Sequence, residues 1–180
     1  MTIDPAADVT LRTAFALLFA VAASHKVRDP ARFRATLADY RLLPAPFVWP
    51  AAMLTIGAEL AVAVVLLVSS WRALGPLTAA ALLCVYAVAM AINLARGRRH
   101  LDCGCAGPAH RQPISGGLVV RNALLAATVL VAVVPVRPRP LLWVDALTVT
   151  AATATLAALY ASLDRLLAQA PALARLRGAA

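Results

Sequence analysis

Five long apolar runs constrain this chain more than any other feature of its sequence. They cover residues 9–27, 47–68, 73–95, 117–136 and 141–163. Each contains about 20 residues, and an α-helix of that length crosses a hydrocarbon layer about 30 Å thick. Because lipid offers the backbone no hydrogen-bond partners, such runs fold as helices. The sequence therefore predicts an all-α fold, an integral membrane bundle of four to five transmembrane helices.

The overall composition agrees with a membrane location. Hydrophobic residues make up 62% of the chain and charged residues 14%, whereas soluble domains are about half apolar and about a quarter charged. The formal net charge is +9, but the arginines lie at the ends of apolar runs and are not interleaved with aromatic residues. We therefore expect a lipid bilayer around the chain and no nucleic-acid partner.

The chain reads as one domain over residues 1–180, with a core at about 9–136. Asp4 and Asp8 stand where a signal peptide would be basic, which predicts no cleavable signal. Asp29 can cap a short interfacial helix that begins at Pro30 and stops at Pro44. The fifth run, 141–163, is followed by a basic amphipathic tail, 164–180, which we expect on a membrane surface.

A polar segment between the third and fourth runs carries two of the three cysteines, Cys103 and Cys105. Cysteines one residue apart close a small strained ring, and strained, exposed disulfides exchange readily. Gly104 between them supplies the backbone freedom that such a ring needs. This pattern predicts a redox pair; a pair of unreactive loop cysteines is the alternative. Cys84 lies in the middle of the third run and reads as an inert small hydrophobe.

A metal site is a second interpretation of the same segment, because thiols and imidazoles suit zinc or copper. The spacing matches no zinc finger, and two cysteines one residue apart have poor geometry for binding the same metal ion. The candidate ligands are His100, Cys103, Cys105 and His110.

Glu59 is a carboxylate deep inside the second run, where an ionisable group is costly and needs a partner. Arg121, near the start of the fourth run, is the predicted partner. The pair is either structural or a functional aid to a thiolate or a quinone. If all runs span, other polar residues gather around the cysteines at the same end, namely His25, Lys26, Asn93 and Asn122.

Several of these residues together resemble the MauE family of methylamine utilisation membrane proteins, which is distantly similar to DoxX-type and vitamin K epoxide reductase-like bundles. The resemblance covers about residues 10–135, and its most specific part is the Cys-Gly-Cys segment followed by an Arg-Asn entry to a span. The matching residues are Lys26, Asp29-Pro30, Phe33, 40–44, Glu59, 93–97, 102–105, Gly107 and 121–125.

The resemblance implies a role in maturing an exported client, such as the disulfide-rich small subunit of methylamine dehydrogenase, in a bacterial-type plasma membrane. It implies a thioredoxin-like partner, MauD, and the redox pair Cys103 and Cys105, with quinone as a candidate electron acceptor. The chain would then be a thiol–disulfide oxidoreductase. Ala106 departs from the aromatic residue common in the family, which leaves the client open. A non-catalytic membrane scaffold and a proton-coupled carrier remain alternatives.

The charge distribution conflicts with this implied location of the cysteines. Basic residues concentrate in loops one and three, so the positive-inside rule predicts cytoplasmic cysteines. Disulfide chemistry on an exported client requires the opposite side, because cytoplasmic thiols are kept reduced. On the resemblance, we favour the outside.

Overall fold

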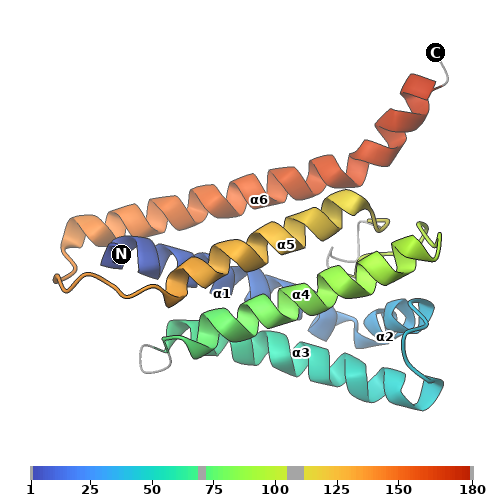
Figure 1. Ribbon diagram of the computed structural model, residues 1–180, viewed down its shortest axis with the longest axis horizontal. Helices are drawn as coiled ribbons and strands as arrows, with labels where there is room; N and C mark the ends of the chain where they lie inside the picture. Colours follow the sequence, from blue (N-terminus) through green and yellow to red (C-terminus); the bar gives the residue numbers. More distant parts are fainter. Residues whose placement is uncertain (1, 69–71, 105–111, 179–180) are drawn as a thin grey trace.

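The computed structural model describes residues 2–68, 72–104 and 112–178 (Figure 1). The helices are α1 (Pro5–Arg28), α2 (Pro30–Asp39), α3 (Ala45–Leu67), α4 (Leu74–Ala95), α5 (Gly116–Leu130), the short 3-10 helix η2 (Val131–Val133) and α6 (Trp143–Gly178). Five of the helical segments are long and apolar enough to cross a membrane, including the fifth run, here Trp143–Gln169. These findings confirm the predicted all-α membrane bundle.

The interfacial helix forms where the sequence predicts it, as α2. The Asp29 carboxylate accepts a hydrogen bond from the Arg32 N–H at 3.0 Å, and Pro30 occupies the first turn. The helix ends at Asp39, earlier than the predicted stop at Pro44, and Arg41 then adopts a φ of 48°. This left-handed conformation reverses the chain before α3 begins.

The apolar core lies among α1, α3, α4 and α5. Its fully or nearly fully buried side chains include Phe19 from α1, Leu66 from α3, Leu83 from α4 and Val129 from α5. Helix α6 packs along α1, on one side of this core (Figure 1). Many large apolar side chains remain exposed on the outer faces, which suits helices surrounded by lipid.

A buried guanidinium ties together the end of the bundle that carries the N-terminus. Arg12 donates to the Asp8 carboxylate at 2.9 Å and to the main-chain oxygens of Arg72 and Ala132 at 2.9 and 2.8 Å. Arg72 in turn donates to Asp8 at 2.8 Å. These bonds connect α1 with the start of α4 and with η2, so the basic residues at this end serve the fold.

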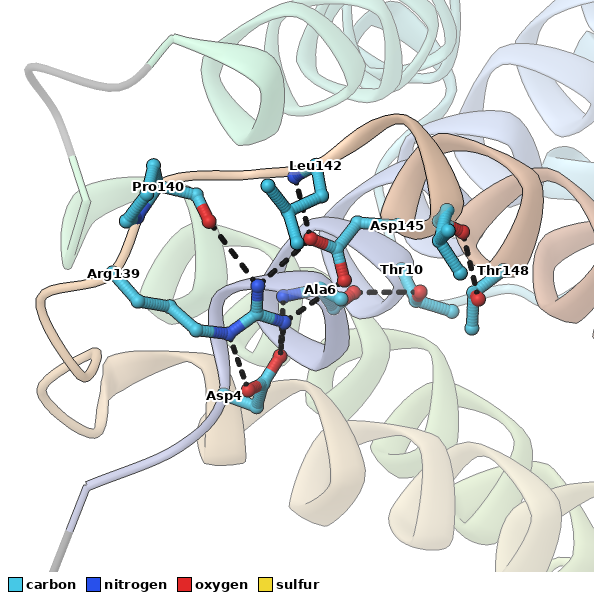
Figure 2. Close-up of polar contacts among 9 residues, drawn as sticks. Asp4, Ala6, Thr10, Arg139, Pro140, Leu142, Asp145 and Thr148 are labelled. Carbon is cyan, nitrogen blue, oxygen red and sulfur yellow. Dashed lines mark hydrogen bonds and ion pairs between the residues drawn. The ribbon is translucent and has the colours of Figure 1, made fainter.

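Arg139 fixes the start of α6 against the start of α1 at the same end. Its guanidinium bridges the carboxylates of Asp4 and Asp145, each at 2.7 Å (Figure 2). Asp4 caps α1 by accepting from the Ala6 N–H, and Asp145 accepts from the Leu142 N–H at the start of α6. One arginine therefore joins two helix N-termini, where carboxylates are favourable.

This bridge predicts a pH dependence of stability. The Arg139 guanidinium, followed by the Ala6 N–H, holds the pKa of Asp4 below its ordinary value of 3.8. A carboxyl group of this kind stabilises the fold above its ordinary pKa and loses that contribution as the pH falls through the lowered value. Asp145 shares the same guanidinium, so the bridge is lost completely only when both carboxylates are protonated. We expect the melting temperature to fall from about pH 5 down to about pH 2, and to fall less in Arg139→Gln. Equal losses in both proteins, measured by thermal unfolding in detergent, would contradict this role.

The boundary between the fifth run and the basic tail at Asp164 stays a prediction, and no break in the helix marks it. Helix α6 continues without a break from Trp143 to Gly178, and its last turns extend beyond the bundle (Figure 1). Asp164 pairs with Arg121 of α5, and its side chain is 27% exposed. A membrane-surface location for the last turns stays a prediction.

Candidate functional site

The backbone around Cys103 is fixed by a short antiparallel pairing. The Cys103 N–H donates to the Gln112 main-chain oxygen at 2.8 Å, and the Ile114 N–H donates to the Leu101 oxygen at 2.8 Å. Leu101 and Ile114 are buried against Tyr40, and the half-buried Cys103 packs beside them. The cysteine segment is thus anchored to the end of the bundle on both flanks.

Helix α2 holds the other side of this segment. Gly104 has a φ of 73°, and a Cβ there would lie 3.3 Å from Thr36 Cγ2 and 3.6 Å from the Phe33 ring. Arg32 of α2 pairs with Asp102 at 3.8 Å. The predicted interfacial helix therefore has a function in the fold that its sequence did not reveal: it forms a wall beside Cys103.

The conformation of Gly104 requires a glycine, because a left-handed backbone favours glycine. We expect Gly104→Ala to destabilise the local conformation of the cysteine segment by about 1–2 kcal/mol, since the added methyl meets both strain and the α2 wall. This should change how readily Cys103 reacts. The measurement is the rate of Cys103 alkylation in the purified protein. Gly116→Ala is the matched control, because a Cβ at Gly116 meets nothing within 4 Å. An unchanged rate in Gly104→Ala would contradict the idea that α2 shapes the segment.

A small polar pocket of about 30 Å³ lies between the cysteine segment and the helices α1 and α2. Its lining includes His25 and Lys26 from α1, Arg32 from α2, and Asp102 and Gly104. Cationic groups near a cysteine favour its thiolate, whereas a carboxylate disfavours it. The predicted gathering of His25 and Lys26 near the cysteine segment is confirmed.

Below this pocket, Lys26 and Glu59 form a buried ion pair. The Lys26 Nζ donates to Glu59 Oε1 at 2.6 Å, and the Tyr86 hydroxyl donates to the same oxygen at 2.8 Å. The Lys26 and Glu59 side chains are 4% and 0% exposed. Lys26 also lies 5.2 Å from the centre of the Phe33 ring, within the range of a cation–π contact.

The predicted pairing of Glu59 with Arg121 is wrong. Helix α1 packs against α3, and this packing places Lys26 beside Glu59. Arg121 pairs with Asp164 of α6 instead. Arg121 also lies 5.4 Å from the centre of the Tyr160 ring. Tyr86, which donates to Glu59, and Asp164, which pairs with Arg121, were not predicted, because neither residue is marked as a partner by its place in the sequence.

Some of the remaining predicted site residues lie within the described residues, and others lie outside them. Asn93 is fully buried, and its side-chain oxygen accepts from Arg98 at 3.1 Å. His100 is exposed, whereas Cys105 and His110 lie outside the described residues. Within residues 2–68, 72–104 and 112–178, no three His, Cys, Asp or Glu side chains are grouped to hold a metal ion.

Sequence comparison connects this arrangement with known proteins. The model of the family described as Methylamine utilisation protein MauE matches residues 5–135. The chain is 37% identical to the Methylamine utilization protein MauE of Methylophilus methylotrophus over 166 residues, which are 91% of this chain and 87% of the relative. It is 41% identical to the MauE protein of Paracoccus denitrificans over 128 residues, 71% of this chain and 69% of the relative. No solved structure matches significantly.

Proposed function

Because this chain belongs to the MauE family of methylamine utilisation membrane proteins, we propose that it assists disulfide formation in an exported partner through the pair Cys103 and Cys105. The observation that carries the proposal is the fixed position of Cys103. Its backbone N–H donates a hydrogen bond to Gln112, and the adjacent Gly104 lies against α2. His25 and Lys26 line the pocket beside it. A cysteine whose backbone is held in this way at the end of a membrane bundle can be presented to a soluble partner.

The chemistry is thiol–disulfide exchange in two steps. A thiolate of the partner attacks one sulfur of the Cys103–Cys105 disulfide, which gives a mixed disulfide and releases the other sulfur as a thiol. The second thiol of the partner then resolves the mixed disulfide, so the partner is oxidised and Cys103 and Cys105 are reduced. Return of the reduced pair to its disulfide would release two electrons and two protons, and a quinone would supply an acceptor for them.

The proposed location of the cysteines is the outer face of a bacterial plasma membrane. The arginine count opposes this side, but several of these arginines are engaged in holding the fold together. Arg98 donates to the main-chain oxygens of Asp39 and Tyr40 at 2.8 and 3.2 Å, and Arg32 pairs with Asp102. Arginines that bond to the protein in this way are weaker evidence for a cytoplasmic loop than arginines that are fully solvated.

Trapping of a mixed disulfide tests the proposal. We expect one of the single variants Cys103→Ser and Cys105→Ser to accumulate a covalent complex with a thioredoxin-like protein or a client, because the resolving sulfur is missing. The complex should disappear on reduction, and it should be absent in the double variant. The measurement is a non-reducing gel with identification by mass spectrometry.

Thiol labelling in the same cells shows on which side of the membrane Cys103 and Cys105 lie. A membrane-impermeant thiol reagent should label Cys103 and Cys105 in intact cells after reduction. Labelling that requires lysis would put both thiols in the cytoplasm and remove the proposed mechanism. Absence of any trapped complex, with the partner still co-purifying with the double variant, would favour the scaffold interpretation.

A further inference from the structure

A large cavity lies among α1, α5 and α6. Its volume is about 640 Å³, within the range of sites for small organic ligands. Most of the lining is apolar, with Phe15 and Leu18 from α1, Leu125 from α5 and Leu156 from α6 among its residues. The space is left beside α6 because that helix packs along α1 with little burial: no residue in the most apolar part of its span is buried.

The cavity follows the long direction of the bundle. Helices α1 and α6 contact each other, and both begin at the end of the bundle where Arg139 joins them. The lining residues of α1 extend from Leu11 to His25, which is about 20 Å of helix. Those of α6 extend from Leu156 to Ala168, toward the cysteine end. A space of this shape suits an extended apolar chain better than a compact ligand.

The cavity opens sideways toward the hydrocarbon layer. Leu17, Val21 and Leu159 line it and are 44%, 44% and 61% exposed. In a membrane bundle, apolar side chains with this exposure contact the acyl chains of the bilayer. An acyl chain can therefore enter the cavity beside α6 without crossing a polar barrier.

One cation at the cysteine end of the cavity is left uncompensated. Lys26 neutralises the Glu59 carboxylate in the lining. Asp164 neutralises the Arg121 guanidinium. Arg165 also lines the cavity, but it is exposed and forms no ion pair with the side chains that the structure describes. The apolar space therefore has a positive charge at one end.

We infer that this cavity binds one anionic phospholipid from the leaflet at the cysteine end, with an acyl chain along α1 and its phosphate at the Arg165 guanidinium. Arg165 lies near the end of the span Trp143–Gln169, where a long side chain can reach the headgroup layer. A guanidinium binds phosphate oxygens through two parallel hydrogen bonds. A zwitterionic lipid carries its own ammonium group, which competes with Arg165 for the phosphate. The inference goes beyond the proposed function and does not depend on the cysteines.

Native mass spectrometry of the full-length protein tests the headgroup. The protein in a neutral detergent is titrated with phosphatidylglycerol or phosphatidylcholine of identical acyl chains, and the dissociation constant of the first bound lipid is measured. We expect phosphatidylglycerol to bind about fivefold more tightly, as for one basic residue at an anionic headgroup. Arg165→Gln should abolish this preference. Arg34→Gln is the matched control, because Arg34 is exposed at the same end and does not line the cavity.

A second pair of variants tests the acyl chain. Ala157 and Ala158 are neighbouring exposed residues of α6, and only Ala157 lines the cavity. We expect Ala157→Trp to weaken the binding of both lipids about tenfold, because the indole displaces two or more methylene groups from the cavity. Ala158→Trp should bind both lipids as the natural protein does.

Four outcomes would overturn the inference. The first is equal binding of the two lipids by the natural protein. The second is an equal loss of preference in Arg165→Gln and Arg34→Gln, which would show a diffuse surface charge. The third is displacement of phosphatidylglycerol by glycerol phosphate at equal concentration, which would show a site for free phosphate groups. The fourth is equal lipid binding by Ala157→Trp and Ala158→Trp; a dimer lost only in Ala157→Trp would then assign the cavity to a helix of a second copy.

The cysteine variants keep this test separate from the proposed function. Cys103→Ser should bind both lipids with the affinities of the natural protein, because Cys103 does not line the cavity. Unchanged lipid binding in a chain whose cysteines prove dispensable would therefore refute the proposed function and leave the lipid site standing.

Discussion

Lys26→Met is expected to destabilise the bundle by about 3–5 kcal/mol, because it leaves the Glu59 carboxylate buried without its cation. Glu59 is 0% exposed, and the Tyr86 hydroxyl would be its remaining donor. A lone charge of this kind also disfavours the span itself, since ionisable groups inside a membrane need partners. The measurement is the free energy of unfolding of the purified protein in mixed detergent micelles.

Two variants separate the buried pair from a general loss of charge. In Lys26→Met/Glu59→Met, both partners become apolar, and we expect stability close to that of the natural protein. Arg28→Met removes a cation from the same end of α1 at an exposed position, and we expect a change within about 0.5 kcal/mol. If Lys26→Met is as stable as the natural protein, the ion pair does not hold α1 to α3.

Cys103→Ser and Cys105→Ser are each expected to abolish disulfide formation in the client, because a serine oxygen cannot take part in disulfide exchange. The measurement is the fraction of client thiols that resist alkylation in cells that carry each variant. Cys84→Ser is the matched control: Cys84 is exposed on the outer face of α4, and its replacement should leave client oxidation unchanged. The amount of each variant in the membrane is measured in parallel.

The parallel measurement distinguishes chemistry from assembly. Normal amounts of protein with reduced client would agree with a redox pair. Full client oxidation in both serine variants would refute it. Loss of client oxidation only in proportion to lost protein would instead point to a static disulfide within a scaffold.

The sequence by itself determined that the apolar runs are helices and roughly where each one lies. Each span is specified locally, because about 20 apolar residues can satisfy their backbone in lipid only as a helix. The α2 helix was equally local, since Asp29 and Pro30 define its start. The end of the bundle that carries Cys103 was also predictable, because consecutive spans must alternate in direction.

Only the tertiary structure decided which polar residues meet. The spans are apolar on every face, and lipid is as apolar as the protein interior, so the sequence pattern does not mark the inward face. For that reason Glu59 could be recognised as needing a partner, but the choice of Lys26 over Arg121 follows from the packing of α1 on α3. Asp164, which follows the last apolar run in the sequence, pairs with Arg121 of α5 only through the packing of the helices.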